Sequence, residues 1–140
     1  MFRFVLLMFL FVSSAEAKEY YGPYQADVVR VVDGDTVELA IHVWPGLVQT
    51  IKLRLDGVNT PEKRGKNVSQ CEKEAGNKAT AFTEYWLSDV ETVTVDKVFL
   101  GKFAGRAIGQ ILKGDESLSD ALISAGHGKH YSGGKRQPWC

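Results

Sequence analysis

Apolar and polar residues alternate along two neighbouring segments of the chain, at residues 26–32 and 36–43. A period of two is typical of a β-strand with one buried face. In the second segment the apolar residues occupy every other position: Val37, Leu39, Ile41 and Val43. Between the segments lies Asp33-Gly34-Asp35, and Asp-Gly is a favoured hairpin turn. The pattern predicts two strands joined as a hairpin.

A third alternating segment at residues 50–55 follows a break at residues 44–46 that contains proline and glycine. In an extended chain, Leu53 and Leu55 face one side of this segment and Arg54 faces the other. We therefore expect a third strand that continues the meander and presents Arg54 on its polar face.

Two later segments have helical spacing. Residues 72–87 contain no proline and a single glycine, and their apolar residues recur at helical intervals: Ala75, Ala79, Phe82 and Trp86. A second, short helix is expected after Ser117 or Ser119, either of which can cap its N-terminus, and it should end at Gly126.

Residues 90–98 and 106–112 alternate again and predict a fourth and a fifth strand. Five short strands with helices inserted and appended are typical of the OB-fold, a five-stranded Greek-key barrel. The chain has 140 residues, 44% of them hydrophobic, which suits one domain with a packed core. We predict a mainly β (α+β) protein, a five-stranded OB-fold barrel with about three helices.

The first 17 residues have the organisation of a signal peptide. Arg3 precedes an apolar run at residues 4–12 that is too short to span a bilayer, and Ala15 and Ala17 supply the small side chains of a cleavage site. We expect cleavage after Ala17 and a mature domain of residues 18–140 that is secreted or periplasmic, without a stable membrane span. The alternatives are an uncleaved anchor and a buried N-terminal element.

The charge of the chain is balanced, with 17 basic and 17 acidic residues. Removing residues 1–17 takes away Arg3 and Glu16 and leaves it neutral, which argues against a protein that coats nucleic acid by bulk charge. The segment from Gly126 to the end is different, since it has no Asp or Glu and contains three basic residues, Lys129, Lys135 and Arg136, and two histidines, His127 and His130. It is either part of a local anion site or a solvated basic tail.

The chain contains two cysteines, Cys71 and Cys140. In an exported protein an even number favours a disulfide over a metal site or a nucleophile. A bridge between them would tie the chain end to the middle of the domain, and in the chain-entropy model it would stabilise the fold by about 4 kcal/mol.

Several polar residues can carry chemistry, although each is ordinary by itself. Asp33 and Asp35 flank a turn and offer the oxygen ligands that hard cations prefer, but taken alone Asp-Gly points more to a plain hairpin turn than to a metal site. Arg54 and Arg106 are far apart in sequence, and Glu62 follows a proline in a loop.

The order of these motifs is more informative. Asp-Gly-Asp-Thr-Val begins at Asp33, Asn59-Thr60-Pro61-Glu62 begins five positions after Arg54, and Lys102-Phe103-Ala104-Gly105-Arg106 follows. Together they resemble the staphylococcal nuclease (thermonuclease-like) family over roughly residues 28–131. The first two motifs are rather specific at this separation, and the third is less so.

The resemblance implies an endonuclease that hydrolyses phosphodiester bonds of DNA and RNA with one Ca²⁺ ion and leaves 3′-phosphate ends. By position, Arg54, Glu62 and Arg106 would be catalytic residues, the arginines on the phosphate and Glu62 on the attacking water. The metal ligands would be Asp35, Asn59 and Thr60. Lys102 and Tyr131 are weaker candidates for substrate binding.

Two departures from the family pattern affect these assignments. Asn59 stands where the family has a second metal-binding aspartate, so a cation should bind more weakly, and Mg²⁺ or Mn²⁺ becomes an alternative to Ca²⁺. The stretch from Lys102 to Arg106 is one residue longer than in the pattern, which weakens the assignment of Lys102.

Two other classes of function are compatible with the sequence. One is a non-catalytic OB-fold module that binds nucleic acid or protein, and the other is an envelope protein whose Asp-Gly-Asp turn binds Ca²⁺ for stability alone. Both arginines and Glu62 are present, which favours the enzyme. We expect a monomer with DNA or RNA as its partner.

Overall fold

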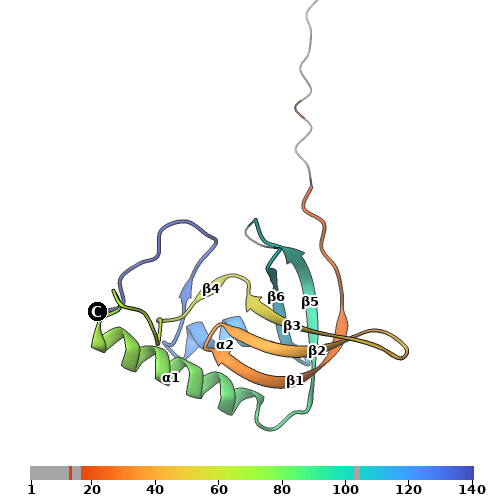
Figure 1. Cartoon of the computed structure of the whole chain (residues 1–140), viewed down its shortest axis with the longest axis horizontal. Coiled ribbons are helices and arrows are strands. Elements are labelled where there is room, and N and C mark those ends of the chain that lie inside the picture. The colour runs from red at the N-terminus through yellow and green to blue at the C-terminus, as the bar shows by residue number, and fades with distance from the viewer. Residues whose placement is uncertain (1–12, 14–16, 103–104) are drawn as a thin grey trace, which may run out of the picture.

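The computed structural model describes residues 13, 17–102 and 105–140, and its elements are arranged as in Figure 1. The predicted signal peptide, residues 1–17, lies outside the described residues except for Ser13 and Ala17. Within the described part of the chain, no helix combines the length and the apolar character needed to cross a membrane.

The predicted hairpin is confirmed by β1 (Tyr24–Asp33) and β2 (Thr36–Trp44), which pair antiparallel. The pairing ends with Asp33 opposite Thr36, so the two-residue connection is Gly34-Asp35. Register shifts in β1 bend the hairpin near this turn. The turn therefore holds its carboxylates at the end of a twisted ribbon.

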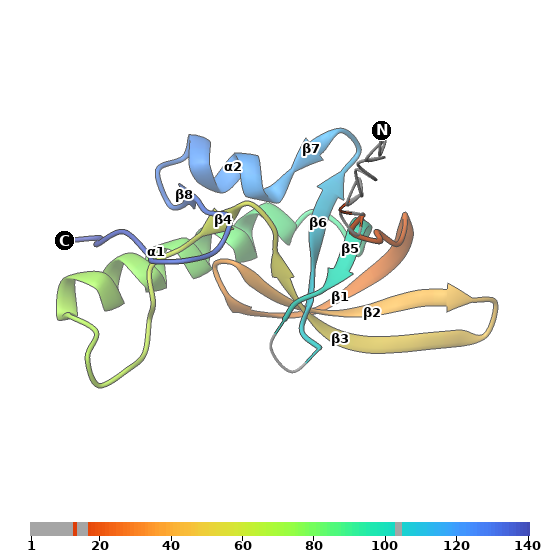
Figure 2. The same ribbon diagram turned by 90° about the horizontal axis from the view of Figure 1, so that it is seen from above.

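The third strand, β3 (Leu47–Leu55), starts earlier than the alternation predicts. Pro45 and Gly46 do not interrupt the ladder, because they form the tight turn between β2 and β3, with Trp44 paired to Leu47. Gly46 has a φ of 82°, a conformation that glycine adopts at little cost. The resulting long hairpin projects from the body of the protein (Figure 2).

The predicted five-stranded barrel is confirmed. β5 (Thr92–Leu100) pairs with β1, and β6 (Ala107–Lys113) pairs with β5 and then runs parallel to the end of β3, which closes the sheet. The short strand β7 (Glu116–Ser117) extends β6. A separate two-stranded sheet joins β4 (Val58–Asn59) to β8 (Lys129–His130). This small sheet brings the C-terminal segment beside the end of β3.

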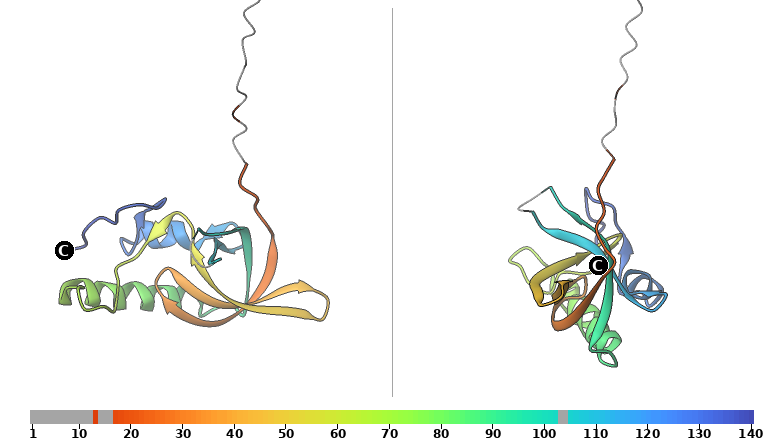
Figure 3. Two further views of the ribbon diagram at one scale, coloured as in Figure 1. Left: turned by 45° about the horizontal axis from the view of Figure 1, so that its top comes forward. Right: turned by 90° about the vertical axis from the view of Figure 1, so that its right-hand side faces the viewer.

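The described residues contain two helices, where the sequence predicted about three. α1 (Gln70–Leu87) is capped by Ser69, and α2 (Leu118–Ser124) is capped by Ser117, whose hydroxyl accepts from the backbone N–H of Asp120 at 3.4 Å. Ser119, the other cap candidate, instead donates to the backbone oxygen of Asp56 at 2.9 Å. α1 lies along one side of the barrel, as both views of Figure 3 show.

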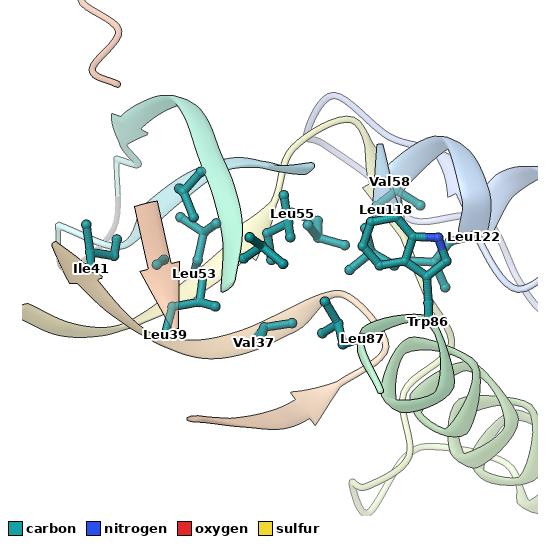
Figure 4. Close-up of a cluster of buried hydrophobic side chains, with 14 residues drawn as sticks. Val37, Leu39, Ile41, Leu53, Leu55, Val58, Trp86, Leu87, Leu118 and Leu122 are labelled. Carbon is teal, nitrogen blue, oxygen red and sulfur yellow. The ribbon is translucent and has the colours of Figure 1, made fainter. Parts of the chain in front are cut away.

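The hydrophobic core fills the barrel and continues under both helices (Figure 4). The strands contribute the alternating residues that the sequence pattern identified, and the helices contribute Trp86, Leu87, Leu118 and Leu122. Burial of these side chains fixes the ends of the strands relative to α1. The position of the strand ends relative to α1 determines where a polar pocket lies at the end of the barrel.

Candidate functional site

Residues that are far apart in the sequence line one polar pocket at the end of the barrel. They come from the β1–β2 turn, the end of β3, the loop after β4, the start of β6 and the C-terminal segment: Asp33, Asp35, Thr36, Arg54, Thr60, Pro61, Glu62, Arg106 and Arg136. The pocket thus gathers five of the residues that the sequence singled out: Asp35, Arg54, Thr60, Glu62 and Arg106.

A buried ion pair between Arg54 and Asp35 forms the floor of this site. Nη1 of Arg54 lies 2.7 Å from Oδ2 of Asp35, and the two side chains are only 10% and 11% exposed. The same Oδ2 accepts from the backbone N–H of Thr60 at 3.1 Å, and Oδ1 accepts from the hydroxyl of Thr36 at 3.1 Å. These bonds offset the cost of burying the charges and fix both side chains.

Arg54 faces away from Leu53 and Leu55, as predicted, but it is buried and not solvated. Its guanidinium also donates to the backbone oxygen of Val58 at 3.3 Å and to Oδ1 of Asn59 at 3.4 Å. The loop after β3 therefore folds over Arg54 and encloses it. Among the described residues, no buried side-chain nitrogen or oxygen lacks a hydrogen-bond partner.

Arg106 is held more loosely. It is exposed, and its Nη2 donates to the hydroxyl of Thr36 at 3.5 Å. Its backbone oxygen accepts from the N–H of Gly101 at 2.7 Å, which fixes the backbone just before β6. The guanidinium of Arg106 remains accessible to an anion that enters from solvent.

Helix α1 supports the two loops that carry Asp35 and Glu62. A Cβ atom built on Gly76 would lie 2.7 Å from the backbone carbon of Glu62, so the helix and the Glu62 loop are in direct backbone contact. The hydroxyl of Thr83 donates to the backbone oxygen of Gly34 at 2.7 Å. One rigid helix thereby sets the separation of the two loops.

Arg136 lies in the same pocket and was not assigned to a site by the sequence reasoning. Its Nη1 pairs with Oε1 of Glu62. Partial burial opposes the charge of Arg136, but the hydrogen bond and the negative charge of Glu62 outweigh it and raise the pKa of the guanidinium above its ordinary value. Arg136 is therefore a permanent cation beside Glu62. The sequence feature that could have pointed to Arg136 is the basic C-terminal segment that ends at a cysteine.

The predicted disulfide is present between Cys71 and Cys140, with a Cα–Cα distance of 6.3 Å. It links the first turn of α1 to the end of the chain, and Figure 1 shows the C-terminus beside that turn. Such a bond is compatible with an extracellular location. It also ties down the segment that carries Arg136.

The remaining candidates lie outside this pocket. Asn59 and Tyr131 line a neighbouring pocket formed largely by the C-terminal segment, and the hydroxyl of Tyr131 donates to the backbone oxygen of Gly134 at 2.9 Å. Lys102 is exposed in the loop between β5 and β6 and lines neither pocket. The structure thus brings Asn59 to the edge of the site and keeps Lys102 apart from it.

The donor chemistry around Asp35 suits a hard cation with few protein ligands. Asp35, Asn59 and Thr60 all carry oxygen donors, as Ca²⁺ and Mg²⁺ prefer. However, Oδ2 of Asp35 and Oδ1 of Asn59 already accept hydrogen bonds from Arg54. No group of three or more His, Cys, Asp or Glu residues within the described residues could hold a metal. Water and substrate oxygens would have to complete the coordination of a cation here.

More than half of the chain matches a known protein family. A family model described as staphylococcal nuclease homologue matches residues 52–138. The matched region includes Arg54, Glu62, Arg106 and Arg136 but begins after the turn that carries Asp35. The place of Asp35 in the site therefore rests on its contacts with Arg54 and Thr60. No curated protein matches the chain.

Proposed function

Because the chain belongs to the family of staphylococcal nuclease homologues, we propose that it is a metal-dependent endonuclease that hydrolyses phosphodiester bonds of DNA, RNA or both. The observation that carries this proposal is the convergence of Arg54, Glu62 and Arg106 with Asp35 in one polar pocket. The expected products have 3′-phosphate and 5′-hydroxyl ends.

The arginines suit the charge that develops during the reaction. A phosphodiester is already an anion, and its non-bridging oxygens gain charge when a nucleophile attacks the phosphorus. Guanidinium groups offer paired donors that match two such oxygens, so Arg54 and Arg106 stabilise the transition state more than the ground state. Arg106 is accessible to the substrate, whereas the fixed position of Arg54 provides a preorganised charge.

Glu62 is the group that orients or activates the attacking water. Its carboxylate lines the pocket and is 40% exposed, so water can reach it. When the water oxygen bonds to phosphorus and the bond from phosphorus to the 5′ oxygen breaks, Glu62 holds or accepts the proton that the water loses, and the 5′ oxygen takes up a proton from solvent. A carboxamide at this position could still hold the water but could not accept its proton.

A divalent cation would be held chiefly by Asp35, with Asn59 and Thr60 as further oxygen donors. When bound, it supplies positive charge to the phosphate oxygens. Since Asn59 is neutral, we expect weaker cation binding than two carboxylates would give, with Ca²⁺, Mg²⁺ and Mn²⁺ as the ions to compare.

The proposal includes export of the mature chain, residues 18–140, after cleavage behind Ala17, to a secreted or periplasmic location. The disulfide between Cys71 and Cys140 supports this, because such bonds persist in oxidising compartments. We expect the mature chain to act as a monomer.

The test is cleavage of labelled single-stranded DNA, double-stranded DNA and RNA by the mature chain with Ca²⁺, Mg²⁺, Mn²⁺ or chelator. Glu62→Gln should lower kcat by about 10²–10⁴-fold, because general base catalysis contributes about that much, while substrate binding is kept. Glu84→Gln, at an exposed position on α1, is the matched control. No cleavage with any cation by a folded protein would favour a non-catalytic binding module.

A further inference from the structure

We infer that Arg136 is a third substrate-binding arginine, which gives up its bond to Glu62 when it contacts phosphate oxygens of the nucleic acid. The C-terminal disulfide holds Arg136 in the pocket. The inference rests on the proposed function, because it assumes that the polar pocket receives a phosphodiester. It assigns a role to the basic C-terminal segment, for which the sequence allowed two alternatives, part of an anion site or a solvated tail.

The first observation is the position of the side chain. Arg136 lines the pocket together with Arg54 and Arg106, and its side chain is 47% exposed, so it faces both the site and solvent. Nη1 engages Glu62, whereas a guanidinium has five N–H donors in a rigid fork. Arg136 therefore has donors to offer an entering phosphate.

The second observation is the charge of the pocket lining. Three carboxylates, on Asp33, Asp35 and Glu62, line it. Arg54, Arg106 and the ammonium of Lys63, which lies 3.9 Å from Asp33, already balance their charge. Arg136 adds one positive charge to this balance, and a positive excess favours the binding of an anionic substrate.

The third observation is that the segment carrying Arg136 is anchored on both sides. Before it, β8 pairs with β4, and the backbone N–H of Tyr131 donates to the oxygen of Gly57 at 3.0 Å. After it, Cys140 is bonded to Cys71, and the carbonyl of Pro138 accepts from Nζ of Lys129 at 2.8 Å. Without the disulfide this stretch would be a free chain end, and placing Arg136 in the pocket would cost its conformational entropy.

A competing interpretation is that Arg136 blocks Glu62 and inhibits the enzyme. The two interpretations predict opposite changes. If Arg136 binds substrate, its removal weakens binding and slows cleavage at low substrate concentration. If Arg136 inhibits, its removal frees Glu62 and raises the rate.

The experiment uses the disulfide-bonded mature chain with Arg136→Gln, Arg136→Lys and, as a control, Lys78→Gln at an exposed position on α1. Binding of a fluorescently labelled single-stranded oligodeoxynucleotide is measured by anisotropy with chelator, over a range of salt concentrations, and KM is measured from its cleavage with a divalent cation. We expect Kd and KM to rise about tenfold or more in Arg136→Gln, as loss of a charge-assisted hydrogen bond implies, and to recover in part in Arg136→Lys.

The salt dependence separates substrate contact from a structural role. Arg136→Gln should reduce the slope of log K against log salt by about 0.7, the value for one lost phosphate contact on a single strand. Lys78→Gln should leave the slope unchanged. Unchanged Kd and slope in Arg136→Gln, faster cleavage, or a wild-type chain that does not bind would overturn the inference.

A second arm tests the disulfide. Cys71→Ser with Cys140→Ser should raise KM in the wild-type background and add little in the Arg136→Gln background, because both changes remove the same contact. Equal increases in the two backgrounds would overturn the role given to the disulfide. If the chain binds DNA through Arg136 but no cation supports cleavage, hydrolysis is wrong and the binding role of Arg136 stands.

Discussion

Arg54 and Arg136 both line the polar pocket and both pair with a carboxylate, but the protein holds them in different ways. Arg54 comes from a barrel strand, and its pair with Asp35 is almost fully buried. Arg136 comes from an irregular segment, and its pair with Glu62 has side chains that are 47% and 40% exposed. The first arginine is fixed by the core and the second by a covalent link near the chain end.

The difference shows how one pocket can combine rigidity with access. A buried guanidinium that an ion pair and hydrogen bonds hold in place is preorganised and needs no rearrangement when the substrate arrives. A half-exposed one can exchange its carboxylate partner for a phosphate at little cost, since exposed ion pairs contribute about 0–1 kcal/mol. The two pairs should therefore respond very differently to mutation.

The largest expected effect is on stability at Arg54. Arg54→Met should lower the free energy of unfolding by about 3–5 kcal/mol, because it leaves the carboxylate of Asp35 buried without its partner. Arg136→Met should lower it by less than about 1 kcal/mol. Urea unfolding monitored by tryptophan fluorescence measures both.

A double variant sharpens this comparison. Adding Asp35→Asn to Arg54→Met removes the unpaired charge and should restore part of the lost stability. If Arg54→Met and Arg136→Met destabilise the protein equally, the contrast between a core-held and a tethered arginine is wrong.

The barrel could be predicted from sequence because period-two alternation directly encodes which strand faces are buried. The boundary that differs and the alternative left open both lie at turns and ends. Pro45 and Gly46 were interpreted as a break in the pattern, yet they form a tight turn that continues the ladder. The choice between Ser117 and Ser119 as the helix cap depended on the backbone of Asp56, a contact that no local pattern contains.

The pocket was predictable where the family motif covers it and not elsewhere. The order of the motifs predicted that Arg54, Glu62 and Arg106 belong to one site, and the structure places them in one pocket. Burial of Arg54 was not predictable, because it depends on the loop at Val58 and Asn59 folding back over β3. Arg136 was missed because its place depends on a disulfide that anchors the end of its segment, and a pairing of cysteines does not show which side chain of that segment enters the pocket.

A smaller effect is expected where α1 supports the Glu62 loop. Gly76→Ala should cost about 1–3 kcal/mol of stability, because the added Cβ would lie 2.7 Å from backbone atoms of Glu62 and Lys63 and must displace that loop. The same shift should lower kcat, since Glu62 would move relative to Arg54. Urea unfolding and steady-state cleavage measure the two effects.

Asn77→Ala is the control for this change, because it adds no atoms toward the loop and lies at an exposed position of the same helix. Helix propensity alone predicts that Gly76→Ala stabilises the protein by about 1 kcal/mol. A gain in stability with unchanged kcat would show that the loop is not held by close contact with α1.

The smallest effect concerns Asn59, which lies beside Arg54. Asn59→Asp adds a carboxylate near Asp35, so a divalent cation should bind about tenfold more tightly, equivalent to about 1.4 kcal/mol. Calorimetric titration of the chain with Ca²⁺ and with Mg²⁺ measures this without any substrate. Asn77→Asp adds the same charge on α1, away from the pocket, and should change the affinity little. If Asn59→Asp raises thermal stability without tightening cation binding, the new carboxylate pairs with Arg54 instead of the metal, because Oδ1 of Asn59 already lies 3.4 Å from that guanidinium.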